Sequence, residues 1–177
     1  MALVAVVVVS GAAPAQAASP AEASSPRGFD PEYLLATYYD DAHLNPASEL
    51  LTRREDEPID FYLACWGEEW PFEGCKLIDE LSDGAYYSVR WQSGLLIPAT
   101  GHYTFTLANV DDGARLFIDG APVIDQGWHW PDPDVRPSPQ TLSLEAGWYP
   151  ITIDYEQRPP YIASRRSGGR ARPSPTR

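Results

Sequence analysis

Residues 107–125 constrain the fold more than any other stretch of this sequence. Two apolar runs are separated by Asp111-Asp112 and a glycine, and the second run, residues 115–118, leads directly into Asp119-Gly120. An Asp-Gly pair between apolar runs is among the strongest short-range signals for a β-hairpin. The stretch therefore predicts a strand, an acidic tip, a second strand, a tight turn and a third strand.

Other parts of the chain show the two-residue alternation that is typical of half-buried strands. In residues 102–107, for example, Tyr103, Phe105 and Leu107 share one face and threonines the other. The polar run after residues 34–39 shows no such pattern, and no segment keeps a helical period over the length of an ordinary helix. Many short strands with Gly, Pro and Asp turns predict an all-β fold, an antiparallel β-sandwich or barrel. Further strands are expected at residues 34–39, 86–91, 95–97, 141–144 and 148–155.

The beginning of the chain is typical of an exported protein. An apolar run at residues 3–9 is followed by the small-residue triplet Ala15-Gln16-Ala17, a pattern that predicts a signal peptide cut after Ala17, although no positive charge precedes the run. The run is too short for a membrane span, which needs ~20 residues.

The length of the chain leaves room for one domain. We expect a signal peptide at 1–17, a flexible leader at 18–28, a β domain at 29–157 and an Arg/Pro-rich disordered tail at 158–177.

The two cysteines, Cys65 and Cys75, fit a secreted protein. An even pair this close in an oxidising compartment favours a disulfide. A zinc site is the rival interpretation, but no histidine or further cysteine lies nearby to complete the metal's ligands.

Charge and motifs exclude several classes of function. The net charge of −12 includes six arginines from Arg158 onward, so the body before them is near −18. Such a surface argues against nucleic acid, because phosphate contacts need Lys and Arg. It suits calcium, neutral sugars or solubility alone. The sequence has no Gly-x-Ser-x-Gly, no His-Glu-x-x-His and no phosphate-binding glycine loop, so we expect no enzyme.

Five segments together are informative about the family: residues 87–91, 98–105, 111–120, 123–125 and 144–147. In order and spacing they resemble the PA-fourteen (PA14) domain family, named after a piece of a bacterial toxin's protective antigen. The resemblance covers roughly residues 34–157 and implies an antiparallel β-sandwich of a kind found in bacterial glycosidases, secreted toxins and yeast adhesins. In the adhesin branch an Asp-Asp pair joined by a cis peptide binds calcium, which helps to hold a sugar. The matching positions here are Asp111 and Asp112.

The chemistry of Asp111 and Asp112 can also be argued from geometry. Successive side chains of an extended strand point to opposite faces, so neighbouring aspartates converge on one ion only if the backbone departs from that geometry, as a cis peptide does. Calcium takes six to eight oxygens, so another loop must supply the rest. We expect residues 126–140 to do so, with stacking of aromatic rings on a sugar. The candidate ligand-binding residues are Trp128, His129, Trp130, Asp132 and Asp134.

Two functions therefore remain open at this stage. The first is a secreted or cell-surface carbohydrate-binding module that recognises a glycan through calcium at Asp111 and Asp112. The second is a non-catalytic interaction or spacer domain of a larger secreted or surface protein, in which the acidic tip is only a turn and binds no metal.

Overall fold

A computed structural model describes residues 10–11, 33–55, 78–82, 86–108, 110, 112–127, 136 and 138–158 of the chain. These residues form antiparallel strands and a single 3-10 turn, η2 (Pro46–Ser48), and contain no α-helix. No helix among them is long and apolar enough to cross a membrane.

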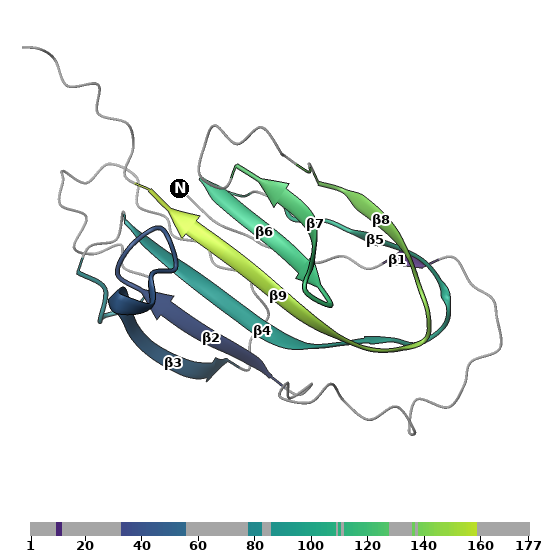
Figure 1. The fold of residues 1–177 in the computed structure, drawn as a ribbon, viewed down its shortest axis with the longest axis horizontal. Coiled ribbons are helices and arrows are strands. Elements are labelled where there is room, and N and C mark those ends of the chain that lie inside the picture. Colours follow the sequence, from purple (N-terminus) through teal and green to yellow (C-terminus); the bar gives the residue numbers. More distant parts are fainter. Residues whose placement is uncertain are drawn as a thin grey trace, which may run out of the picture.

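The described strands form two antiparallel sheets (Figure 1). The order in the large sheet is β3-β2-β4-β9-β6-β7, and in the small one β1-β5-β8. The strands of the large sheet are β2 (Leu34–Tyr39), β3 (Glu49–Glu55), β4 (Tyr87–Ile97), β6 (Gly113–Ile118), β7 (Ala121–Gln126) and β9 (Gly147–Gln157). Those of the small sheet are β1 (Ser10–Gly11), β5 (Gly101–Phe105) and β8 (Gln140–Leu144).

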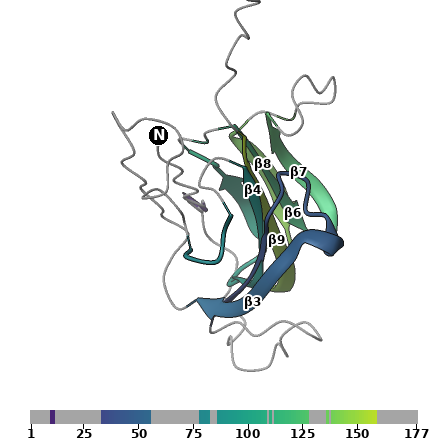
Figure 2. The same cartoon turned by 90° about the vertical axis from the view of Figure 1, so that its left-hand side faces the viewer.

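The hydrophobic core lies between the two sheets and contains buried residues from β2, β4, β6, β7 and β9 of the large sheet and from β5 of the small one. Tyr103 and Phe105 of β5 are buried in one cluster with Trp91 of β4, Leu116 of β6 and Ile153 of β9. Figure 2, a view turned by 90°, shows the large sheet with β3 nearest to the viewer. The predicted all-β, antiparallel sandwich class is therefore confirmed.

β9 is one of the two central strands of the large sheet. Along its whole length of 11 residues it pairs with β4, from Gly147 opposite Ile97 to Gln157 opposite Tyr87. On its other side it pairs with β6, where Glu156 lies opposite Gly113. Because both neighbours run antiparallel to β9, its end at Gln157 lies beside the start of β6.

The predicted hairpin turn is confirmed. Ile118 pairs with Ala121, and the two residues between them, Asp119 and Gly120, have φ angles of 51° and 73°. Positive φ at both central positions is what a type I′ turn requires, and its twist matches that of the strands it joins. The turn fixes the register of β6 and β7 next to it, and an irregularity between Leu116 and Phe117 shifts the pairing further along the strands.

Two expectations about strands need correction. The sequence predicts two short strands in residues 86–97, but β4 is continuous, because Gly94 is accommodated opposite Pro150 within the β4–β9 ladder. The sequence also predicts no strand after residues 34–39, yet β3 pairs there with β2. β3 is an edge strand with mostly exposed residues, so burial imposes no alternation on its sequence.

Candidate functional site at one end of the large sheet

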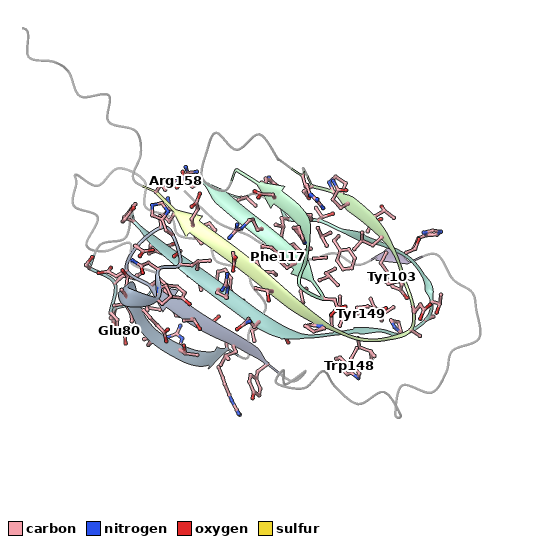
Figure 3. The ribbon with its side chains drawn as sticks, in the orientation of Figure 1. Glu80, Tyr103, Phe117, Trp148, Tyr149 and Arg158 are labelled. Carbon is pink, nitrogen blue, oxygen red and sulfur yellow. The ribbon has the colours of Figure 1, made fainter. Side chains whose placement is uncertain are left out.

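The acidic tip lies where three strands of the large sheet meet. β6 begins at Gly113, directly after Asp112, while β7 ends at Gln126 and β9 at Gln157. Since neighbouring strands are antiparallel, these three points fall at the same end of the sheet. Figure 3 labels Arg158 at this end, and Trp148 and Tyr149 at the other.

The carboxylate of Asp112 is anchored by the end of β9. Its Oδ2 atom accepts a hydrogen bond of 2.7 Å from Gln157 Nε2 and another of 2.7 Å from the backbone N–H of Arg158. Asp112 itself has a φ of 69°, in the left-handed region that Asp tolerates better than most residues. The backbone at Asp112 therefore departs from extended geometry immediately before β6 begins.

Two glycines allow the backbone segments at this end to approach closely. A Cβ atom at Gly127 would lie 2.5 Å from the carbonyl oxygen of Asp112, and one at Gly113 would lie 2.8 Å from Glu156 Oε1 and 3.0 Å from Gly127 O. No larger residue fits either position without movement of the backbone or of a buried carboxylate. The tip is therefore tightly packed around its oxygen atoms.

The guanidinium of Arg158 bridges two oxygen atoms at the tip, one from Gly127 and one from Glu156. Its Nη2 donates to Gly127 O at 3.0 Å and forms an ion pair with Glu156 Oε1 at 3.2 Å. Glu156 is fully buried, so this pairing compensates a charge that would otherwise be costly to remove from water. Arg158 thus connects the ends of β7 and β9.

A second buried carboxylate, Asp154, lies two residues before Glu156 on the same face of β9. Arg90 binds it through two hydrogen bonds, from Nε to Oδ1 at 2.7 Å and from Nη2 to Oδ2 at 2.9 Å, and Arg115 Nη2 adds a third to Oδ2 at 3.0 Å. The hydrogen bond with Asp154 raises the pKa of Arg90 further above its usual value. Both arginines are therefore held in place on this face of the sheet.

A model of the PA14 domain matches residues 77–168. The chain belongs to the PA14 domain family. The chain spans only a small part of each of two longer relatives. The chain is 34% identical over 105 residues to the anti-sigma-I factor RsgI3 of Acetivibrio thermocellus, a match covering 59% of this chain and 14% of the relative. A solved anti-sigma factor domain-containing protein from Clostridium clariflavum is 30% identical, with a TM-score of 0.53 over 70% of this chain and 37% of its own.

The structure describes one of the site residues predicted for this PA14 domain, Asp112, and places it in the cluster above. The other predicted residues lie outside the described part of the chain, as do both cysteines of the predicted disulfide. Within the described residues, no group of three or more His, Cys, Asp or Glu side chains is arranged to hold a metal ion. The predicted residues outside this part are Asp111, Trp128, His129, Trp130, Asp132, Asp134, Cys65 and Cys75.

The sequence interpretation did not identify Gln157 and Arg158 as part of the PA14 tip. Arg158 is the first residue of the segment expected to be a disordered tail, yet both its backbone and its side chain bind the tip. Their position at the end of a long alternating strand is the available signal, but it becomes informative only once β9 is known to lie beside β6.

Proposed function

We propose that this PA14 domain is a non-catalytic carbohydrate-binding module of a secreted or cell-surface protein. The observation that carries the proposal is the Asp112 carboxylate, held by two donors at the strand ends in the position where the family resemblance expects a ligand site. The predicted signal peptide and the predicted Cys65–Cys75 disulfide are consistent with export and belong to the same proposal.

Calcium suits the donor atoms found at the tip. It prefers hard oxygen ligands, and a carboxylate such as that of Asp112 is one of them. Nearby, the side-chain oxygen Oε1 of Gln126 is buried and has no hydrogen-bond partner among the described residues, so a donor or a cation would satisfy it. In the proposal Asp111 and Asp112 hold the ion, and Asp132 and Asp134 contribute oxygens. A bound calcium supplies positive charge that sugar hydroxyls can coordinate.

The sugar contacts proposed for the loop after β7 rely on its aromatic residues. Trp128 and Trp130 offer flat apolar surfaces that match the face of a pyranose ring, while His129 offers a hydrogen-bonding edge. The chain would thus combine coordination of hydroxyl groups with stacking on the ring.

Absence of catalysis is part of the proposal. Hydrolysis of a glycosidic bond needs two carboxyl groups that flank the bond and exchange protons or form a covalent bond. The two buried carboxylates on the outer face of β9, Asp154 and Glu156, are both paired with arginines. Such pairs are suited to joining strands, which supports a structural role for both groups.

Isothermal titration of the full chain against a glycan panel tests this function, first with calcium and then with a chelator. We expect at least one glycan to bind with calcium and to lose its binding when the metal is removed. The double variant Asp111→Asn, Asp112→Asn should behave like the chelated protein. Binding that survives both treatments would exclude the calcium mechanism, and no binding to any glycan would exclude carbohydrate recognition.

A second candidate is an interaction or spacer domain without metal. It is favoured by the small share of the named relatives that the chain spans, 14% of one and 37% of the other, which places the rest of each relative outside the domain. An experimental structure with calcium in the buffer separates the candidates. A trans Asp111–Asp112 peptide with diverging carboxylates and no ion would favour the spacer.

A further inference from the structure

Gln157 links the rigid centre of the large sheet to the acidic tip. Its Nε2 donates to Asp112 Oδ2 at 2.7 Å, while its Oε1 accepts from the hydroxyl of Tyr155 at 2.5 Å. The carboxylate of Asp112 can only accept, so it requires the NH2 group of the amide, and Oε1 then faces the Tyr155 hydroxyl, which donates to it. The amide therefore presents its NH2 group to Asp112.

Tyr155 is well suited to orient this amide because it can hardly move. Its side chain is 1% exposed, and its ring lies 6.0 Å from that of Tyr87 and 6.4 Å from that of Trp91, measured between centroids. Its backbone is paired on both sides, with Val89 of β4 and Ala114 of β6. The position of the Tyr155 hydroxyl is thus set by the core.

The Asp112 carboxylate depends on such support because Asp112 precedes the first residue of β6 and has a left-handed backbone. Strand pairing therefore does not fix its side-chain direction. We propose that Gln157, oriented by Tyr155, is a positioning residue that holds the Asp112 carboxylate ready for a cation, with the backbone N–H of Arg158 as the second support. This inference rests on the proposed calcium site and adds to it the residues that hold the Asp112 carboxylate in place.

Hydrogen-bond partners of metal-binding carboxylates are part of a metal site, and their loss typically lowers metal affinity about 10- to 100-fold. The variant Gln157→Met keeps the length and approximate volume of the side chain but cannot donate to Asp112. The same substitution at Gln92, in the middle of β4 and remote from the tip in the strand register, is a matched control. Titration with calcium should show an affinity that is at least about 10-fold lower for Gln157→Met than for the wild type, and unchanged for Gln92→Met.

A second measurement does not need the metal. In the metal-free full chain, NMR should show the side-chain NH2 of Gln157 exchanging with solvent more slowly than that of Gln92. In Tyr155→Phe, which lacks the orienting hydroxyl, this protection should fall, while far-UV circular dichroism stays that of the wild type.

The two measurements separate the inference from the proposed function. If the wild type binds no calcium, the calcium proposal fails, and protection of the Gln157 amide that depends on Tyr155 still supports the positioning role. An unprotected Gln157 amide, or equal calcium affinity in wild type and Gln157→Met, would overturn the inference. Wild-type calcium affinity in Gln157→Asn would also contradict the inference, because the shorter side chain cannot reach from Tyr155 to Asp112.

Discussion

Gly127 and Gly120 have similar φ angles but different surroundings. Their φ angles are 78° and 73°, both in the left-handed region where a side chain causes strain. A Cβ at Gly120 would meet nothing within 4 Å, whereas one at Gly127 would lie 2.5 Å from Asp112 O. The pair therefore separates backbone strain from a steric conflict at the tip.

We expect Gly127→Ala to destabilise the protein more than Gly120→Ala. The latter should cost about 1–2 kcal/mol, which is the strain of a left-handed residue with a Cβ. The former adds displacement of the Asp112 backbone, for which a further 1–3 kcal/mol is a rough expectation. Urea unfolding of both variants measures the difference. Equal losses would mean that the tip can open without cost.

Asp112 and Gln157 differ in how far the sequence could identify them. Asp112 belongs to an Asp-Asp-Gly motif whose chemistry can be argued locally. Gln157 acts on a residue 45 positions away, and its role depends on which strands are neighbours and on the hydroxyl of Tyr155. Residue types predict a carboxylate site, whereas the groups that orient the carboxylate depend on the sheet order.

At the scale of the elements, β2 and β3 are joined at the edge of the sheet by a polar cluster. The hydroxyl of Tyr38 and the indole Nε1 of Trp91 both donate to the carboxylate of Glu55, the latter at 3.0 Å, and Arg53 forms an ion pair with it at 3.2 Å. Burial, followed by the hydrogen bond and charge of Glu55, raises the pKa of Tyr38 well above its usual value, and Arg53 opposes this only in part.

This pKa shift predicts how the edge responds to alkaline pH. The folded state holds the Tyr38 proton more tightly than the unfolded chain, whose tyrosines ionise near a pKa of ~10. The contribution to stability is therefore fully present below about pH 10 and is lost as the pH rises from there towards the folded pKa. Chemical denaturation from roughly pH 8 to pH 12, a range centred on the tyrosine pKa, measures how the free energy of unfolding changes with pH.

Tyr38→Phe should show a shallower loss of stability above about pH 10 than the wild type. At neutral pH it should be less stable by about 1 kcal/mol, since Glu55 loses a hydrogen bond. Tyr86→Phe, which removes a more exposed hydroxyl bound to His43, is the control and should keep the wild-type slope. Identical slopes for all three proteins would contradict the role of Tyr38.

Strand prediction from sequence succeeds for several strands and fails for β3 at the edge of the large sheet. β5, β6 and β9 were predictable because each alternates between the core and the outer face, as in Ile151, Ile153 and Tyr155. β3 carries Leu50 and Leu51 side by side and two consecutive arginines, and nearly all of it is exposed. Its strand conformation comes from pairing with β2, and this pairing cannot be predicted from the residues of β3 alone.

For the molecule as a whole, one row of side chains crosses the outer face of the large sheet through all six strands. Asp154, at its centre, is 0% exposed, while the side chains of Arg90 and Arg115 beside it are 36% and 26% exposed. Opposite charges alternate from β4 to β7, and a pair of threonines continues the row to the edge. In register order the row consists of Thr52, Thr37, Arg90, Asp154, Arg115 and Asp125.

We expect Asp154→Asn to destabilise the whole sheet. It removes the charge that Arg90 and Arg115 share, and loss of one partner of a buried ion pair typically costs about 3–5 kcal/mol. Partial exposure of both arginines favours the lower end of that range. Urea unfolding measures the change, with Asp79→Asn, an exposed aspartate in a turn, as the control. A loss no larger than that of the control would mean that the row is not a stabilising feature.

The central place of β9 also determines when the sheet can be completed during synthesis. β2, β3 and β4 on one side and β6 and β7 on the other are made first, and β9 then enters between them. Until residues 147–157 have left the ribosome, β4 and β6 each present an open edge to their surroundings. A nascent chain stalled before Gly147 would therefore expose two pairing edges and the core residues that pack against Ile151, Ile153 and Tyr155, which is the condition that favours association with other chains.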